Sequence, residues 1–235
     1  KRLFLYIINI SIENATQKMS AADRPPYRTR YVIEIMHESQ KPEVRLFKQF
    51  LKGINCYGAE SEIEGFSGYL CEILIIKYQT FQKLLNDSKN WKEGKKIALT
   101  KDKSPDFNTP LVFIDPVDVN RNVASALSNE KFNLFVIASN EYLKKPRLTF
   151  FFPNDIKPWR LEKISEEINK QDCKYIGIRI DKPDIIDENL YPQARKTLKS
   201  IWETSSREGF TIFDIRFFID EEMEKIYFIV KSKDE

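Results

Sequence analysis

Residues 65–76, GFSGYLCEILII, decide the fold of this chain more than any other stretch. The second half of the segment is apolar on nearly every side, which predicts a helix buried inside a domain. We expect this helix to span residues 66–85. Four of the seven glycines of the chain fall within sixteen residues around its start: Gly53, Gly58, Gly65 and Gly68. Such local use of glycine is typical of tight turns between helices, or of a backbone that closely approaches a ligand.

An amphipathic helix is predicted just before this segment, starting at Pro42. Its apolar stripe consists of Val44, Phe47, Leu51 and Ile54, and a second stripe is cationic: Lys41, Arg45, Lys48 and Lys52. The cations follow one another at spacings of four, three and four, which places them on one side of the helix. They fit two interpretations, a solvated helix face and a face that contacts phosphates.

The positive charge of the chain is concentrated in the same region. Residues 1–52 contain ten Lys/Arg against five Asp/Glu, whereas the remaining residues contain 28 against 30. The net charge of +3 does not by itself identify a nucleic-acid partner. Its local concentration nevertheless suits a site for a polyanion.

The other elements of the first half are shorter. Residues 3–12 predict a strand that is apolar on both faces, and Pro25 and Pro26 predict an extended turn within a polar segment. A polar segment covers residues 86–110. Further along, the pattern predicts one short strand and two helices: residues 111–114, 122–128 and 130–144, the last capped by Ser128 or Asn129.

The pattern changes after the basic run at residues 144–147, which is the best candidate for a domain boundary. It then predicts a helix from Pro158, a strand at 176–180, a helix from Pro192, and a hairpin of residues 210–218 and 225–231. This order is typical of a small α+β sandwich with its helices on one face. We therefore assign the whole chain to the α+β class.

Composition excludes several kinds of protein. The 235 residues are 42% hydrophobic and 31% charged, as in an ordinary globular chain, and no apolar stretch is long enough to span a membrane. Three scattered cysteines argue against a disulfide scaffold and favour the reducing cytoplasm. His37 is the only histidine, which excludes multi-histidine metal sites and disfavours a Ser–His–Asp triad. Carboxylates with Mg²⁺, or lysines and arginines acting on phosphates, remain as candidate chemistry.

The D-P-V-D sequence at residues 115–118 has two interpretations. Two carboxylates three residues apart can bind Mg²⁺, whereas a proline-stiffened loop capped by aspartate is the structural alternative. Arg121 follows this loop. It could pair with Asp118, or it could contact a base edge or a phosphate.

Taken in order, seven segments resemble the archaeal CCA-adding tRNA nucleotidyltransferases, class I enzymes that build the CCA end of tRNA from CTP and ATP. The segments are ADR (22–24), EVRLFKQF (43–50), YGAE (57–60), GFSGYLCE (65–72), DPVD (115–118), RNVA (121–124) and KPDIID (182–187). The resemblance implies a remnant strand of the catalytic head in residues 1–20. It also implies a helical central domain in 21–145, like those of poly(A) polymerases and oligoadenylate synthetases, and an incomplete ferredoxin-like α+β domain in 146–235.

The resemblance also implies which residues bind the nucleotide. Lys48 and Tyr57 match the family's lysine and tyrosine that contact the triphosphate, and Arg121 matches the arginine that helps to recognise the base. Where the family has a threonine and a histidine for the phosphates, this chain has Pro25 and Arg28. Arg28 keeps the capacity to hold a phosphate, but Pro25 has no hydrogen-bond donor. The other cations of the stripe are expected to contact RNA: Lys41, Arg45 and Lys52.

The motifs of the family's catalytic head are missing from this sequence. It contains no G-S dipeptide and no D-x-D pair, and its first acidic residue is Glu13. Nucleotidyl transfer in this family needs carboxylates that hold Mg²⁺. We therefore predict no catalytic or metal-binding residue here, place the Mg²⁺ carboxylates on a separate or missing head, and expect this chain alone to be inactive.

Three hypotheses follow. The first is the nucleotide-recognition part of a CCA-adding enzyme, with tRNA, CTP and ATP as partners and a homodimer as a possible assembly. The second is a headless paralogue that binds tRNA or another RNA, or docks to a separate catalytic subunit. The third is a relative in fold only, whose basic helix is solvated surface.

Overall fold

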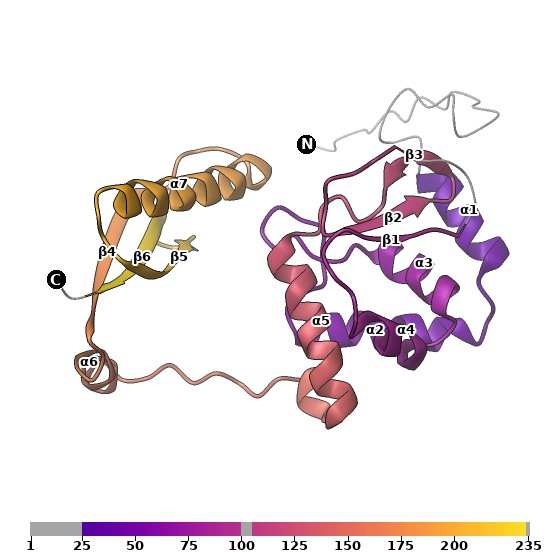
Figure 1. Ribbon diagram of the computed structural model, residues 1–235, viewed down its shortest axis with the longest axis horizontal. Coiled ribbons are helices and arrows are strands. Elements are labelled where there is room, and N and C mark those ends of the chain that lie inside the picture. Colours follow the sequence, from indigo (N-terminus) through magenta and orange to yellow (C-terminus); the bar gives the residue numbers. More distant parts are fainter. Residues whose placement is uncertain (1–24, 100–104, 234–235) are drawn as a thin grey trace, which may run out of the picture. The chain divides into compact units, whose positions relative to one another are not determined.

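The computed structural model describes residues 25–99 and 105–233 (Figure 1). It separates into two compact units, the first ending at Pro153 and the second beginning at Asn154. The strand predicted at residues 3–12, and with it the head remnant predicted in 1–20, lies outside the described residues. Among the described helices, none combines the length and the apolar composition that a membrane crossing requires.

The first unit combines helices with a small sheet. Its helices are α1 (Pro25–Ile35), α2 (Gln40–Gly53), α3 (Gly68–Tyr78), α4 (Phe81–Ser88), α5 (Asn129–Lys144) and the short 3-10 helix η3 (Leu148–Phe150). Its strands are β1 (Lys95–Ile97), β2 (Leu111–Asp115) and β3 (Asp118–Asn122). The central strand, β2, pairs in parallel with β1 and antiparallel with β3. The short β1 was not predicted, because the sequence analysis identified residues 86–110 only as a polar segment.

The predicted buried helix is confirmed as α3, which lies in the middle of the first unit (Figure 1). Leu70 and Leu74 on this helix are fully buried. The predicted amphipathic helix is confirmed as α2, whose Phe47 packs against the rings of Phe66 and Phe135 at centroid distances of 6.2 and 5.8 Å. Burying an aromatic or aliphatic side chain of this size stabilises the fold by about 1.5–3 kcal/mol each. These buried side chains therefore hold α2 and α3 firmly in the core of the first unit.

The single helix predicted over residues 66–85 is wrong, because the chain forms two helices there. Gln79 ends α3 with a φ of 72°, in the left-handed region that stops a helix. The hydroxyl of Thr80 then accepts a hydrogen bond from the backbone N–H of Lys83 at 3.2 Å and caps α4. The apolar periodicity continues through both helices, so it gave no sign of the break.

Two further sequence-based predictions differ from the structure. Pro25 and Pro26 open α1 instead of forming an extended turn, since the first turn of a helix does not need the N–H groups that proline lacks. Residues 122–128 are not helical. The chain forms β3 up to Asn122, whose side-chain oxygen accepts a hydrogen bond from the backbone N–H of Phe113 at 2.9 Å.

The second unit is a three-stranded antiparallel sheet with a long helix on one face (Figure 1). Its elements are α6 (Leu161–Asn169), β4 (Cys173–Asp181), α7 (Asp187–Arg207), β5 (Ile212–Asp220) and β6 (Lys225–Lys233). The strand order is β4-β6-β5, and Leu190 and Ala194 of α7 pack on Ile226 and Phe228 of β6. The β-α-β-β order with the third strand in the centre corresponds to the first half of a ferredoxin-like fold. The α+β class is confirmed.

The predicted hairpin is confirmed as β5 and β6, whereas the predicted start of the preceding helix is wrong. That helix begins at Asp187, and Pro192 lies within it. Asp187 and Glu188 occupy its first turn, where negative charge stabilises a helix. Pro192 is exposed, so the carbonyl that loses its partner can be solvated.

The division between the units follows Pro153, and the predicted boundary follows residue 145. The segment between these positions contacts α2. The amide of Gln49 donates to the backbone oxygen of Phe151 at 2.8 Å, and the rings of Phe50 and Phe150 stack at 6.0 Å. These contacts hold η3 on the first unit.

Candidate nucleotide-binding site

Two of the predicted nucleotide ligands, Lys48 and Tyr57, meet at the N-terminus of α3. A Cβ atom built on Gly68, the first residue of that helix, would lie 3.4 Å from the Tyr57 hydroxyl oxygen and 3.7 Å from Nζ of Lys48. Lys48 comes from α2, and Tyr57 comes from the loop that joins α2 to α3. The fold therefore brings together residues that the sequence separates.

The glycine-rich loop places Tyr57 through backbone contacts. Tyr57 and Phe66 form an isolated parallel bridge, and the N–H of Gly58 donates to the carbonyl of Phe66 at 3.0 Å. Gly58 has a φ of 128°, which glycine adopts without strain. A Cβ atom on Gly65 would lie only 2.2 Å from the carbonyl oxygen of Cys56. Two of the four glycines are thus required by the turn itself.

Several positively charged or partly positive groups lie close to this point. The hydroxyl of Ser67 caps α3 by accepting a hydrogen bond from the N–H of Leu70 at 3.1 Å. The first turn of a helix carries partial positive charge and attracts anions. The ammonium of Lys52 lies 5.4 Å from the centre of the Tyr57 ring. Two lysines and one end of a helix therefore surround the tyrosine.

Lys48 already has a carboxylate partner. Its ammonium lies 2.8 Å from Glu72 Oε1, and both side chains are half-buried, with 24% and 29% of their surface exposed. Burial lowers the pKa of Lys48, but the hydrogen bond and the charge of Glu72 outweigh it, so that the pKa is raised overall. The sequence analysis did not select Glu72 as a site residue. The sequence feature that could have identified Glu72 is that it is the single charged residue in the otherwise apolar run 70–76.

Arg28, the third predicted phosphate ligand, is held by a buried carboxylate. Its Nη2 and Nε atoms lie 2.6 and 3.0 Å from Asp115 Oδ2, and its guanidinium lies 4.7 Å from the centre of the Tyr69 ring. The hydroxyl of Tyr69 donates to Asp115 Oδ1 at 3.2 Å, and the backbone N–H of Val117 donates to the same oxygen at 3.1 Å. Burial and the charge of Asp115 raise the pKa of Tyr69. Asp115 thus ties α1 and α3 to the end of β2.

These contacts favour the structural interpretation of the D-P-V-D loop over a metal site. Both oxygens of Asp115 are engaged by protein donors, and its side chain is fully buried. Asp118 accepts a hydrogen bond from the backbone N–H of Asn120 at 3.3 Å. Within residues 25–99 and 105–233, no group of three or more His, Cys, Asp or Glu side chains could hold a metal ion.

Arg121, the predicted base ligand, lies on β3 and is partly exposed. Within the described part of the chain, its side chain forms no ion pair, and the alternative pairing with Asp118 is not observed. Its strand is held by Asn122, whose amide donates to the carbonyl of Leu111 at 2.9 Å. The backbone of Arg121 is therefore held in the sheet next to Asn122.

The remaining cations of α2 are exposed. Lys41 forms an ion pair with Glu38 at 2.6 Å, and Arg45 lies at the surface. With Lys48 and Lys52 they form the predicted stripe along one side of the helix.

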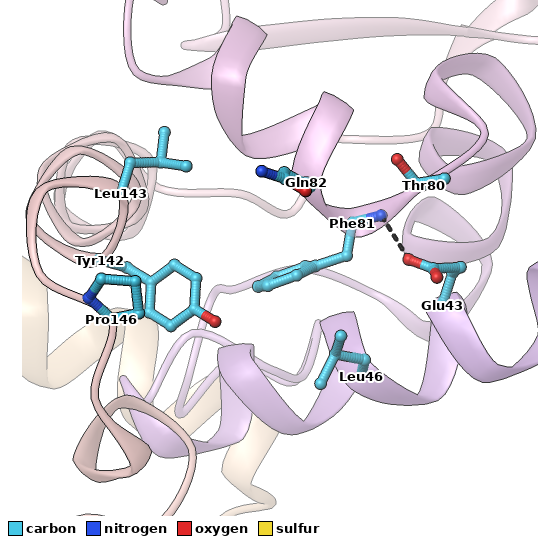
Figure 2. A pocket seen from close by; sticks show the side chains of 8 residues that line it. All are labelled: Glu43, Leu46, Thr80, Phe81, Gln82, Tyr142, Leu143 and Pro146. Carbon is cyan, nitrogen blue, oxygen red and sulfur yellow. Dashed lines mark hydrogen bonds between the residues drawn. The ribbon is translucent and has the colours of Figure 1, made fainter.

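A pocket of the first unit lies on a different flank of α2 (Figure 2). It encloses about 450 Å³ between α2, the start of α4 and the end of α5. At the edge of the pocket, Glu43 Oε2 accepts a hydrogen bond from the backbone N–H of Phe81 at 2.8 Å. The ring of Tyr142 faces the ring of Phe81 (Figure 2). None of the predicted site residues lines this pocket.

Comparison with known proteins matches both units. Residues 42–152 match the family described as tRNA nucleotidyltransferase, second domain, and residues 172–234 match the family described as CCA-adding enzyme, C-terminal domain. The first range contains Lys48, Tyr57 and Arg121.

Similar curated proteins are named CCA-adding enzymes. That of Sulfurisphaera tokodaii is 37% identical over 95% of this chain and 52% of its own length. Those of Haloarcula marismortui and Methanosarcina mazei are 34% and 37% identical, over 92% and 85% of this chain and 46% and 44% of their own lengths. The chain thus spans about half the length of the curated relatives it matches. By these matches, the chain belongs to the family of the CCA-adding enzymes, and it carries their second and C-terminal domains.

Proposed function

We propose that this chain is the nucleotide-recognition and tRNA-contacting part of a nucleotidyltransferase that adds C, C and A to the 3′ end of tRNA from CTP and ATP. The observation that carries the proposal is the meeting of Lys48, Tyr57 and the N-terminus of α3 around Gly68. An ammonium, a hydroxyl and the free N–H groups of a helix end are three kinds of donor suited to a triphosphate.

In this proposal the triphosphate displaces one partner of Lys48. A phosphate at the start of α3 competes with Glu72 for the ammonium, while Tyr57 donates its hydroxyl to the same ligand. Because Glu72 raises the pKa of Lys48, the lysine stays charged throughout the neutral range, both before and after the ligand arrives. Arg121 then contacts the base, where two or more fixed donors distinguish cytosine and adenine from guanine and uracil.

The chemistry of transfer requires Mg²⁺ held by carboxylates. We place these acids on a catalytic head, outside the described residues of this chain. The stripe of Lys41, Arg45 and Lys52 contacts phosphates of the tRNA. A surface of this kind makes affinity fall steeply as salt rises.

The proposal is tested by the binding of CTP and ATP to this chain, measured by isothermal titration calorimetry. Loss of a charge-assisted hydrogen bond costs about 1.5–3 kcal/mol, so Lys48→Gln should weaken binding by roughly 10- to 150-fold. Lys41→Gln removes the same charge from an exposed position of the same helix and serves as the matched control. Equal affinities of the two variants would contradict the placement of the triphosphate.

A headless protein that binds tRNA without using a nucleotide is the second candidate. It is favoured by the ion pairs of Arg28 with Asp115 and of Lys48 with Glu72, which occupy two predicted phosphate ligands. Filter binding of labelled tRNA across a salt series separates the two. Salt-dependent tRNA binding without any CTP or ATP binding would favour this second candidate.

A further inference from the structure

The sheet of the second unit has an outer face, opposite the one that packs on α7. Strand register places Tyr175 of β4, Lys231 of β6 and Asp214 of β5 in one row across this face. Gly177, Ile229 and Arg216 form the next row. Tyr175, on the edge strand β4, keeps 38% of its surface exposed. The two rows thus combine an aromatic ring, an apolar residue and charged side chains on one face of the sheet.

An irregularity in β5 adds a second aromatic ring to this face. The register shifts between Ile212 and Asp214, so the chain contains one extra residue at Phe213. Regular alternation would point Phe213 toward α7, but both Phe213 and its neighbour Asp214 line the same pocket on the outer face. Bulges commonly redirect a side chain in this way. Phe213 is 52% exposed there.

The result is a pocket of about 310 Å³, which we call the sheet-face pocket. It is lined by six residues: Tyr175, Phe213, Asp214, Arg216, Ile229 and Lys231. Its two aromatic side chains stand on the outer strands, β4 and β5, about 10 Å apart at the backbone since two strand spacings separate them. Ile229 forms an apolar floor between them. This volume lies at the lower end of the range for small-ligand sites, about 300–1,000 Å³.

The polar groups at the rim are paired with neighbouring side chains. Nε of Arg216 lies 3.2 Å from both carboxylate oxygens of Asp214. Nζ of Lys231 donates to the side-chain oxygen of Gln171 at 2.6 Å and lies 5.6 Å from the centre of the Tyr175 ring. Donors and an acceptor thus surround a flat apolar slot, which is the arrangement that recognises a heteroaromatic ring with polar edges.

Gly177 keeps the slot open. A Cβ atom built there would touch only Cδ1 of Ile229, at 3.9 Å, and its φ is not in the left-handed region. The backbone therefore does not require glycine at this position. A larger side chain would instead fill the space beside Ile229.

We propose that the sheet-face pocket binds an unpaired base of an RNA strand, stacked on Tyr175 and Phe213. An antiparallel sheet that presents aromatic rings is a common platform for unpaired RNA bases, and stacking tolerates all four of them. The charge of the face agrees with a polyanion, because its strands carry five cations, Arg179, Arg216, Lys225, Lys231 and Lys233, against three acids, Asp181, Asp214 and Asp220. This inference rests on the proposed function in one respect: it takes RNA as the ligand of the chain.

The test uses the whole chain and an RNA of about eight nucleotides that contains one 2-aminopurine, compared with a fully paired duplex of the same length. We expect the single strand to bind more tightly, with quenching of the 2-aminopurine fluorescence upon stacking. Tyr175→Ala removes one stacking surface, and Gly177→Val fills the slot without disturbing a strand, where valine is favoured. Each should weaken binding by roughly 5- to 150-fold.

The matched control is Trp202→Ala, which removes an exposed aromatic side chain from α7, on the opposite side of the sheet. It should leave the affinity within about twofold, and circular dichroism verifies that each variant is folded. Equal binding of single strand and duplex, together with unchanged affinity in both pocket variants, would overturn the proposal. Binding of CTP should be unaffected by Tyr175→Ala and weakened by Lys48→Gln, so failure here is distinguishable from failure of the triphosphate site.

Discussion

Asp115 is the residue whose replacement tests the architecture of the candidate site most directly. We predict that Asp115→Asn destabilises the first unit while the hydrogen bonds from Tyr69 and Val117 persist, since an amide oxygen can still accept them at Oδ1. The substitution removes the charge that faces Arg28 at 2.6 Å and turns an amide group toward the guanidinium. It therefore isolates the ion pair from the rest of the cluster.

The size of the effect follows from the burial of the two partners. Removing one member of a fully buried ion pair costs about 3–5 kcal/mol, and an exposed pair is worth about 0–1 kcal/mol. Asp115 is fully buried, but the Arg28 side chain retains 27% of its exposure and can recover some hydration. We therefore expect a loss of about 2–3 kcal/mol in the free energy of unfolding, between these two limits.

Urea denaturation followed by circular dichroism and tryptophan fluorescence measures this loss. Trp91 is 5% exposed in the core of the first unit and reports on its unfolding. The matched control is Asp106→Asn, because Asp106 pairs with Lys96 while its side chain is 94% exposed. If both variants lose the same free energy, the ion pair of Arg28 does not anchor α1 and the reasoning fails.

Three other predictions concern single positions. Asp87 accepts a hydrogen bond from the indole of Trp91 at 2.7 Å, and such bonds hold its pKa below the ordinary value despite partial burial. Its stabilising contribution is present above the unfolded pKa of about 3.9 and is lost as pH falls through the lower folded value, so the stability difference from Asp87→Asn should shrink below about pH 4 in acid titrations. Gly68→Ala should weaken CTP binding in calorimetry and leave the melting temperature nearly unchanged, since the new methyl makes ordinary contact with Tyr57 at 3.4 Å but occupies the triphosphate position. Gly53→Ala should lower the melting temperature in calorimetric scans, because its Cβ would lie 2.1 Å from a backbone oxygen of η3; an unchanged melting temperature would show that η3 does not press on α2.

Much of the fold could be predicted because burial leaves a periodic trace in sequence. The apolar segment of α3 and the amphipathic pattern of α2 predicted a helix at each of these positions, although the first prediction continued through the end of α3. The breaks were less accessible. The end of α3 depends on the backbone conformation of Gln79, and the bulge in β5 depends on its pairing with β6. Neither is encoded in the hydrophobicity of the residues concerned.

In the candidate site, too, the type of a residue could be read from the sequence, whereas its contact partner could not. Lys48, Tyr57 and Arg121 were predicted as nucleotide ligands from the motifs that resemble the family, and this role stays a prediction. Their partners could not be selected, because Glu72 lies 24 positions from Lys48 and only the packing of α2 on α3 brings the two together.

The ion pair of Arg28 shows why such partners change the functional argument. Considered alone, an arginine in the place of a phosphate-binding histidine gains charge and donors. In the structure, the buried carboxylate of Asp115, 87 positions away, holds two of its nitrogens and neutralises that charge. Lys48 is paired with Glu72 as well, but that carboxylate keeps 29% of its surface exposed, whereas the Asp115 side chain is fully buried. In the proposed function, a phosphate therefore displaces Glu72 from Lys48 more easily than it displaces Asp115 from Arg28. In the proposed function, the phosphate contacts therefore depend more on the α2–α3 corner, where Lys48 and Tyr57 meet at Gly68, than on Arg28 of α1.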